Sequence, residues 1–450
     1  MIPPKPASRS EKVSLWRYMK LFRQDILSAQ PAKLYHAWMA EFRTPFFRSY
    51  MVNDPALLDE VLKARPMEFP KSNRIGAGLR PLLGNSVFLT NGETWLRQRR
   101  IIDPAFEGGR LRDTFPAMWE AGVASVARMA AHDGPVEIEE ECSHAAADVI
   151  FRTLFSVPIE DEMAAQVFHR FRDFQRSQPI LNLAAFLPGR WVPRLFRRET
   201  RAAARDIRAL IGQMVARRAA QIAEGSAPDD LATKIMTTRD PETGACFDAE
   251  EMVDQVAIFF LAGHETSASA LGWALYLLAT HPDWQEKVAQ EAQALRPEFG
   301  TLRDLPVTRD VFRETLRLYP PVPMMVRETT RPEIWRKRKV PKGAQVVLSP
   351  WHLHRHERLW DNPDVFDPAR FATENGKEGL RCAYMPFSAG PRVCTGAGFA
   401  MAEGPLLLAM LLRAFRLETA GDPPVPVAYL TVRSKDGIWL RLTPRAGEAA

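Results

Sequence analysis

The feature that most constrains the fold is one long, mainly apolar stretch, residues 252–278. It is roughly 27 residues long, which is enough to cross a bilayer as a helix. His264, Glu265, Thr266, Ser267 and Ser269 lie at its centre, and ionisable groups at that depth mark a functional interior more often than a lipid-facing span. At about 1.5 Å per residue such a helix reaches about 40 Å. We therefore expect it to cross the protein interior as a central helix.

Helical periodicity dominates the rest of the chain, whereas strand-like runs are short and few. The other helices that we expect are 111–131, 161–175, 197–223, 283–295, 307–318 and 397–415. The strand-like runs are 46–52, 326–330 and 346–349. This pattern predicts a mainly α fold with a small β portion.

The composition is that of an ordinary globular protein, with 46% hydrophobic and 25% charged residues among 450. The net charge is +6, but acids are interspersed with the basic residues. This favours a solvated surface over a nucleic-acid patch, so we expect no nucleic-acid partner. No Gly/Ser-rich hinge separates two halves. We predict a monomer with an N-terminal extension, residues 1–30, followed by a single domain, residues 31–450. Within the extension, the basic amphipathic pattern of residues 14–27 favours a surface helix over a membrane contact.

The four cysteines predict a reducing compartment. Cys142, Cys246, Cys382 and Cys394 lie far apart with no CxxC pair, and residues 1–30 carry no signal-peptide pattern. Cys382 and Cys394 lack the neighbouring His or Cys that a zinc site needs. We therefore expect a cytoplasmic protein without a transmembrane segment.

One cysteine stands in a setting that favours a thiolate. A lone cysteine is more often a small buried hydrophobe. Cys394, however, directly precedes the predicted helix start at Ala397, whose positive end stabilises a thiolate. Gly390 and Gly396 permit a tight turn and a close approach of the backbone to a flat ligand. Arg392 is suited to bind a carboxylate.

This stretch resembles the haem-binding signature FxxGxRxCxG of the cytochrome P450 family at every fixed position: Phe387, Gly390, Arg392, Cys394 and Gly396. The resemblance extends over residues 53–440 and implies the cytochrome P450 fold, with the long helix over the haem. It implies that Cys394 ligates the iron of haem b and donates electron density that favours O–O cleavage. It also implies that Phe387 packs near the sulfur and that Arg392 binds a haem propionate.

Two further motifs support the resemblance. Glu314 and Arg317 share a helical face, alone a common surface pair worth a few tenths of a kcal/mol. In the family this ExxR pair is buried and joined by a later arginine, which Arg370 in the sequence FDPARF resembles, so the implied triad is structural.

Trp95 and Arg99 lie four apart and resemble the family's WxxxR motif, whose side chains contact a propionate; without haem an exposed basic helix would be preferred. Arg327 resembles the arginine that binds the other propionate.

Residues 262–267, AGHETS, resemble the family's oxygen-activating motif in the central helix. The alternative is a polar cluster at a helix kink. The resemblance implies that Gly263 opens room for O2 and that Glu265 and Thr266 guide protons to it. We assign no role to His264.

The family analogy places a substrate cavity along the loop 75–89, the connection 181–191 and residues 322–326, which are mostly apolar. This suits a fatty acid, a terpenoid or another lipophilic molecule. Its Met pair is more often ordinary core packing. The expected lining residues are Phe88, Leu181, Leu183, Phe186, Ala262, Val322, Met324 and Met325.

The sequence pattern predicts that electrons come from a separate protein. No flavin or iron–sulfur pattern follows residue 440, so NAD(P)H would act indirectly, through a ferredoxin or flavodoxin and its reductase. Arg97 and Arg100 are predicted to present positive charge to an acidic partner.

The resemblance thus implies a monooxygenase that uses O2 to hydroxylate or otherwise oxidise its substrate. A peroxide-using peroxygenase and a non-catalytic haem-binding sensor are the alternatives, and the acid–hydroxyl pair Glu265 and Thr266 argues against both. The charged segment 331–339 fits the family pattern least well.

Overall fold

The computed structural model describes residues 2–43, 48–107, 109–177, 198–428 and 430–445. The chain forms two compact units. Unit 1 comprises Met1–Phe69, Gly122–Ala145 and Glu265–Ala450, and unit 2 comprises Pro70–Ala121 and Ala146–His264. Three helices continue from one unit into the other: α6 (Phe115–Ala130), α7 (Ile138–Phe155) and α11 (Ala249–Thr280). The predicted single domain from residue 31 stays a prediction.

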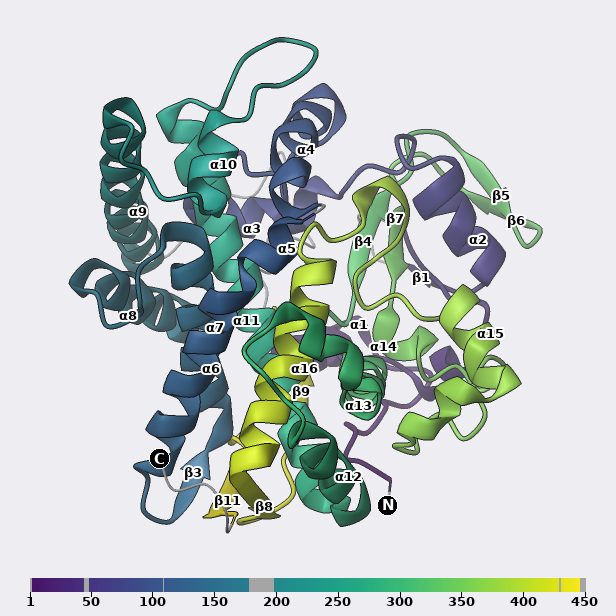
Figure 1. Ribbon diagram of the computed structural model, residues 1–450. Coiled ribbons are helices and arrows are strands. Elements are labelled where there is room, and N and C mark those ends of the chain that lie inside the picture. Colours follow the sequence, from purple (N-terminus) through teal and green to yellow (C-terminus); the bar gives the residue numbers. More distant parts are fainter. Residues whose placement is uncertain (1, 44–47, 108, 178–197, 429, 446–450) are drawn as a thin grey trace. The chain divides into compact units, whose positions relative to one another are not determined.

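Unit 1 contains a four-stranded sheet in the order β1-β2-β7-β4 (Figure 1). Its strands are β1 (Met39–Arg43), β2 (Arg48–Val52), β7 (Gln345–Leu348) and β4 (Met325–Glu328). β2 and β7 are parallel, with Tyr50 opposite Val346, and the other two pairs are antiparallel. The sheet therefore joins the N-terminal part of the chain to a segment nearly three hundred residues later.

The charged segment 331–339 forms a hairpin of β5 (Glu333–Trp335) and β6 (Arg338–Val340). Arg336 and Lys337 form its turn with φ of 47° and 63°. Two consecutive positive φ values match the twist of the flanking strands. The charges face solvent at the turn, while Trp335 and Val340 are buried.

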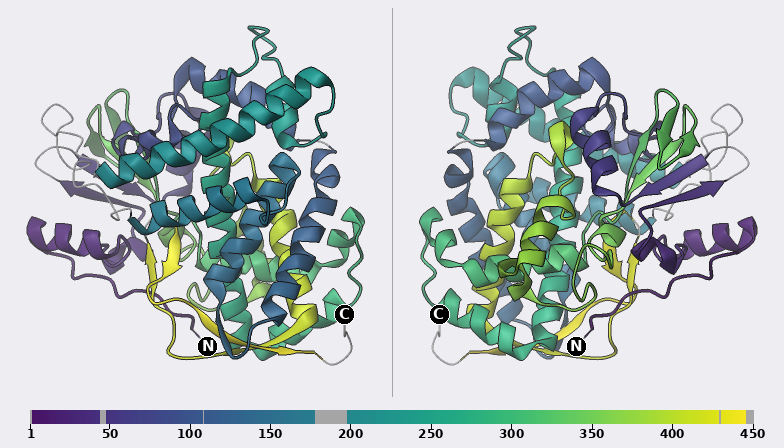
Figure 2. Two further views of the ribbon diagram at one scale, coloured as in Figure 1. Left: turned by 90° about the vertical axis from the view of Figure 1, so that its left-hand side faces the viewer. Right: turned by 90° about the vertical axis from the view of Figure 1, so that its right-hand side faces the viewer.

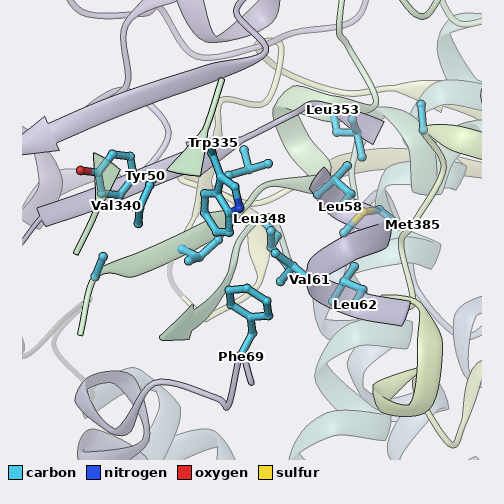
Figure 3. Close-up of a cluster of buried hydrophobic side chains, with 14 of the residues drawn as sticks. Tyr50, Leu58, Val61, Leu62, Phe69, Trp335, Val340, Leu348, Leu353 and Met385 are labelled. Carbon is cyan, nitrogen blue, oxygen red and sulfur yellow. The ribbon is translucent and has the colours of Figure 1, made fainter. Parts of the chain in front are cut away.

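Buried apolar side chains of the hairpin and the sheet form one core cluster (Figure 3). Trp335 packs against Phe69, with ring centroids 5.7 Å apart. Removing this much apolar surface from water at about 25 cal/mol per Å² is the main stabilising contribution. The buried members are Tyr50, Val52, Leu58, Val61, Leu62, Phe69, Trp335, Val340, Ala344, Val346, Leu348, Leu353, Trp360, Phe371, Ala383 and Met385.

Unit 1 also contains a three-stranded sheet and a second hairpin, seen from two sides in Figure 2. The sheet has the order β3 (Pro135–Glu137), β11 (Trp439–Pro444) and β8 (Phe415–Thr419). The hairpin pairs β9 (Pro426–Ala428) with β10 (Val432–Ser434). The helices wholly within unit 1 are α1 (Leu15–Gln24), η1 (Ala32–Tyr35), α2 (Pro55–Asp59), η2 (Glu60–Ala64), α12 (Pro282–Ala292), η4 (Phe299–Asp304), α13 (Pro306–Leu318), α14 (Pro350–Leu353), η5 (Pro368–Ala372), α15 (Glu374–Cys382), η6 (Gly390–Arg392) and α16 (Ala397–Ala414).

Unit 2 is helical within its described residues. Its helices are α3 (Asn73–Leu83), α4 (Gly92–Phe106), α5 (Arg110–Asp113), α8 (Glu162–Ser177), α9 (Arg198–Glu224) and α10 (Leu231–Thr237), with α8 and α9 side by side in Figures 1 and 2. Asp254 on α11 forms a salt bridge of 2.7 Å with Arg208 and accepts a 2.7 Å hydrogen bond from the backbone N–H of Asn85. This carboxylate therefore ties α9 and the end of α3 to α11.

The helices predicted from periodicity are confirmed, with ends that move by a few residues. The predicted helix 111–131 is α5 followed by α6, and the central helix is α11. Helices α3 and α7 are corrections, because residues 75–89 were predicted as a loop and no helix was predicted over α7. The apolar residues of α7 lie on several sides, which removes the amphipathic pattern.

A second correction concerns the membrane-span candidate. In the part of the chain that the structure describes, the one helix long and apolar enough to cross a membrane is α16, and not the predicted stretch 252–278. Of its 18-residue window, 61% is buried inside the protein, and a core helix passes the same test of length and composition.

Candidate active site

A short loop of unit 1 presents Cys394 at the start of α16. The backbone N–H of Cys394 donates a 2.9 Å hydrogen bond to the carbonyl oxygen of Phe387, which closes the loop. Gly390 has φ 67°, and a Cβ there would lie 2.0 Å from the carbonyl oxygen of Leu62. Only glycine satisfies both conditions. The loop therefore lies directly against η2.

The thiol of Cys394 is exposed, and its helix-start setting is as predicted. Gly396 is the N-cap of α16, and its carbonyl oxygen accepts the first helical bond, 2.9 Å from the N–H of Ala400. The positive end of this helix favours a thiolate. Burial instead raises the pKa of the Cys142 thiol, and burial with nearby Glu378 raises that of Cys382.

Two arginines of unit 1 concentrate positive charge beside this loop. Arg327 on β4 and Arg392 in η6 are both buried. Burial, together with the charge of Arg392, lowers the pKa of Arg327 to about 10. Among the described residues, the guanidinium of Arg327 makes one hydrogen bond, a long one of 3.4 Å to the carbonyl oxygen of Val326. Two buried guanidinium groups that repel each other favour an anionic ligand, and their planar donors match a carboxylate.

The predicted pair Trp95 and Arg99 shares one face of α4 in unit 2. The guanidinium carbon of Arg99 lies 5.9 Å from the centroid of the buried Trp95 ring, and Lys71 lies equally far from it. Arg99 also forms a 2.8 Å salt bridge with Asp103 one turn later. The spacing prediction is confirmed for the geometry of the pair, whereas its part in binding a cofactor stays a prediction.

The positive docking face predicted at Arg97 and Arg100 is a correction. Arg97 donates a 3.2 Å hydrogen bond to Glu251, and Arg100 contacts Asp240 at 3.1 Å and Glu242 at 3.0 Å. Each guanidinium charge is thus balanced by an acid within unit 2. Neither arginine supplies a net positive surface of its own.

Glu314, Arg317 and Arg370 meet in the interior of unit 1. Arg317 donates to both oxygens of Glu314 at 2.7 and 2.8 Å, and Arg370 adds a third bond of 2.9 Å. Glu314 and Arg317 are fully buried. Arg317 also donates to the carbonyl oxygens of His354, Pro363 and Val365. Burying two guanidinium groups on one carboxylate requires such complete hydrogen bonding.

His354 was missed by the sequence analysis, although it links this triad to the cysteine loop. Its Nε2 accepts a 2.9 Å hydrogen bond from the backbone N–H of Met385, and its Nδ1 lies 3.2 Å from the carbonyl oxygen of Arg317. Burial lowers the pKa of His354 to about 3, so the ring is neutral with its proton on Nδ1. The histidine-rich sequence 352–356 was its only signal.

The α11 motif places a buried acid in unit 1. Glu265 accepts a 3.3 Å hydrogen bond at Oε1 from Arg433, and burial raises the pKa of Glu265 against the opposing charge of Arg433. Ser267 donates a 2.8 Å hydrogen bond to Glu403, and burial raises the pKa of Glu403 to about 8. Thr266, which lies between Glu265 and Ser267 in the sequence, is half-buried. Arg433 and Glu403 were missed, because they lie on segments without a recognisable motif.

Gly263 and His264, on α11, are the last two residues of unit 2. A Cβ on Gly263 would lie 2.5 Å from the Cδ1 of Ile150 on α7, so a larger residue there would displace the end of that side chain. The implied role of Gly263 in opening room for O2 stays a prediction. His264 is buried and packs edge-on against Phe168, with ring centroids 5.7 Å apart.

The predicted lining residues are only partly described. Leu181, Leu183 and Phe186 lie outside the described residues. Phe88 is 44% exposed, and Ala262 is also exposed. Val322, Met324 and Met325 are half-buried; Met324 packs on the cluster of Leu34, Ala40 and Met51, and Met325 packs on the cluster of Figure 3. Core packing therefore accounts for part of the Met pair, and its contact with a substrate stays a prediction.

Residues 27–438 match the sequence model of the cytochrome P450 family. The chain belongs to the cytochrome P450 family. Cyclooctat-9-en-7-ol 5-monooxygenase of Streptomyces melanosporofaciens is 33% identical over 427 residues, which is 92% of this chain and 87% of that protein. Cytochrome P450 4A11 of Homo sapiens is 32% identical over 414 residues, 83% of this chain and 76% of that protein. The crystal structure of the cytochrome P450DA heme domain superposes with a TM-score of 0.82 at 24% identity over 98% of each chain, which confirms the predicted fold.

This cytochrome P450 is a monooxygenase with haem b, O2 and electrons from NAD(P)H through a redox partner. Its residues fit the haem. The buried, mutually repelling guanidinium groups of Arg327 and Arg392 suit propionates, and the exposed thiol of Cys394 suits the iron. Among the described residues no group of three His, Cys, Asp or Glu side chains offers a metal site of another kind.

Proposed function

We propose that this cytochrome P450 oxidises a lipophilic small molecule, such as a fatty acid or a terpenoid, with electrons delivered by a separate protein. The observation that carries the proposal is the exposed thiol of Cys394 at the N-terminus of α16, beside two buried arginines, in a chain of this family. The described part of the expected lining is apolar: Phe88, Ala262, Val322, Met324 and Met325. A relative is named for its action on cyclooctat-9-en-7-ol, which supports a lipophilic substrate class.

Haem b supplies the binding and reductive activation of O2 when it is bound. We propose Cys394 as the iron ligand, with Phe387 packed near its sulfur and Gly396 allowing the backbone close to the ring. Arg327 and Arg392 of unit 1, and Trp95 and Arg99 of unit 2, would bind the propionates. Glu314, Arg317 and Arg370 would hold α13 and η5 together, because their hydrogen bonds span both.

Glu265 and Thr266 would handle protons. Burial raises the pKa of Glu265, which favours the protonated form that a proton donor needs. Thr266 directly follows Glu265 on α11, and its hydroxyl can both accept and donate a hydrogen bond. We propose that the proton passes from the carboxyl group of Glu265 toward the hydroxyl of Thr266. A peroxide-using enzyme has no need of such a donor, which favours the monooxygenase over the peroxygenase and the sensor.

The electron donor is proposed to be a ferredoxin or flavodoxin with its reductase, in the cytoplasm. Because Arg97 and Arg100 are paired with acids, attraction of an acidic donor would come from the net charge of +6 of the whole chain. Reduction by an acidic ferredoxin should slow steeply with salt, because exposed charges are screened over about 8 Å at physiological ionic strength. A rate independent of salt would contradict charge-guided docking.

One experiment tests the proposed function. Purified haem-loaded protein is titrated with lipophilic candidates, and ligands that shift the haem spectrum are incubated with NADPH, ferredoxin and reductase. We expect a product heavier by one oxygen atom, with 18O from 18O2. NADPH consumption without any oxygenated product across all spectral ligands would favour a binding protein. Product formation with hydrogen peroxide alone, and none with the redox chain, would favour the peroxygenase.

A further inference from the structure

Arg433 on β10 acts on two buried carboxyl groups. Its Nη2 donates a 3.3 Å hydrogen bond to Oε1 of Glu265 on α11. Its charge also lowers the pKa of Glu139, at the start of α7, against a larger effect of burial. The Arg433 side chain is 25% exposed, whereas both acids are buried. The guanidinium therefore reaches from the solvent edge to two groups in the interior of unit 1.

The neighbours of Arg433 hold it at this position. The carbonyl oxygen of Val432 accepts hydrogen bonds from Ser269 at 2.5 Å and from the Trp273 indole at 3.3 Å, both on α11. On the other side, the backbone N–H of Ser434 donates a 3.1 Å hydrogen bond to Glu139. One flanking residue thus binds the helix of Glu265, and the other binds Glu139 itself.

The charges in this cluster do not balance if both acids are ionised. Arg433 supplies one positive charge, and burial penalises the anion of either carboxyl group. The other charged group that acts on Glu139 is Glu137 of β3, whose negative charge further favours a neutral Glu139. Arg433 is the charged group that acts on Glu265. Loss of the charge of Arg433 would therefore leave the effect of burial on the pKa of Glu265 unopposed.

Two atoms of the cluster are open to further hydrogen bonds. Oε2 of Glu265 and Nε of Arg433 are buried and have no hydrogen-bond partner among the described residues. Buried polar atoms of this kind are normally satisfied by ordered water. Glu265 thus keeps one oxygen bound to Arg433 and the other available for proton exchange.

We propose that Arg433 is a positioning residue for Glu265: its guanidinium holds Oε1 of Glu265 and leaves Oε2 available for proton exchange. The proposal rests on the proposed role of Glu265. When Glu265 releases its proton toward Thr266, Arg433 stabilises the carboxylate that remains. A proton from solvent then restores the neutral acid, so no other bond changes in the cluster.

The test measures the pKa of Glu265 directly, in resting haem-loaded enzyme without turnover. Its neutral carboxyl group is followed by the infrared C=O band that Glu265→Gln removes. Arg433→Gln should raise this pKa by about one pH unit or more, because the compensating charge is lost. Arg433→Lys should restore part of the shift. Glu139→Gln should leave the pKa of Glu265 unchanged, because among the described residues Glu139 is bound by Ser434 and makes no hydrogen bond to Glu265. Arg441→Gln, at an exposed arginine of β11, should leave it unchanged.

A shift specific to Arg433 is what the proposal predicts. A pKa of Glu265 that Arg433→Gln leaves unmoved, or that Glu139→Gln and Arg441→Gln raise as much as Arg433→Gln does, would overturn the proposal. Turnover gives a second measurement, in which Arg433→Gln should convert several-fold more NADPH into hydrogen peroxide. If Glu265→Gln itself left coupling normal, the catalytic role of Glu265 would fail, whereas the infrared shifts would still decide whether Arg433 positions Glu265.

Discussion

The hydroxyl of Ser267 on α11 donates a 2.8 Å hydrogen bond to the carboxyl group of Glu403 on α16. Glu403 is buried, and its other oxygen, Oε1, has no hydrogen-bond partner among the described residues. The bond joins the helix that carries Glu265 and Thr266 to the helix that begins after Cys394. A carboxyl group in this setting is far more stable neutral than charged.

Glu403 should make the folded protein less stable as pH rises. Burial raises its pKa from 4.5 to about 8, so between these values the folded state binds more protons than the unfolded state. The free energy of unfolding therefore falls as pH increases through this window. Glu403→Gln should remove this dependence and stabilise the protein at pH 8 relative to pH 5, by on the order of a few kcal/mol. Urea unfolding followed by circular dichroism measures the change.

The control for this prediction is Glu418→Gln, at an exposed glutamate on β8. It should leave the pH dependence as it is. Glu139, whose pKa burial raises to about 7, contributes in the same direction, so Glu403→Gln should flatten the curve without abolishing its slope. An unchanged curve in Glu403→Gln would mean that Glu403 is ionised in the folded protein.

Cys394→Ala should abolish the strongly red-shifted Soret band of reduced protein with carbon monoxide. Cys394 has the helix N-terminus and the buried arginines beside it, whereas the pKa of Cys382 is raised, which disfavours its thiolate. Cys382→Ala is the matched control and should keep the band. Loss of the band in the control, with retention in Cys394→Ala, would move the iron ligand to the other cysteine.

Glu314→Ala and Arg317→Ala should both yield little haem-loaded soluble protein. Each leaves a fully buried charge without its partner, which costs roughly 3 to 5 kcal/mol. That is a large share of the 5 to 15 kcal/mol by which a typical protein is stable. Arg381→Ala breaks an exposed pair with Glu378 at the same spacing and should change neither yield nor melting temperature. Normal melting of the two buried variants would contradict a structural role.

Thr266→Ala should uncouple electron consumption from product formation. A methyl group leaves α11 and the cysteine loop intact, so haem content and the carbon monoxide spectrum should be kept, while more NADPH ends as hydrogen peroxide. Glu265→Gln should differ in kind and slow turnover by about 10²-fold, the range expected for a lost acid–base group. Peroxide and product are measured together per NADPH. Unchanged coupling in Thr266→Ala would reassign the proton path to water or to a substrate group.

Local features of this protein were predictable from sequence, because their geometry depends on spacing alone. A hydrogen bond between Cys394 and Phe387 closes the loop over a few residues, and Gly390 has a positive φ that glycine adopts without strain. Glu314 and Arg317 pair because residues three apart share a helical face. The lengths of α11 and α16 follow from apolar periodicity in the same way.

What only the tertiary structure decided is which charges are balanced. Arg100 is a basic residue on a predicted helix until Asp240, 140 positions away, neutralises it. Arg433 belongs to a short strand without a motif, yet it contacts Glu265 across 168 positions. The energy of a charge depends on its burial and on its neighbours, and both are set by packing between distant segments. Spacing along the chain therefore revealed which side chains carry the chemistry, and the fold set which of them keep a proton.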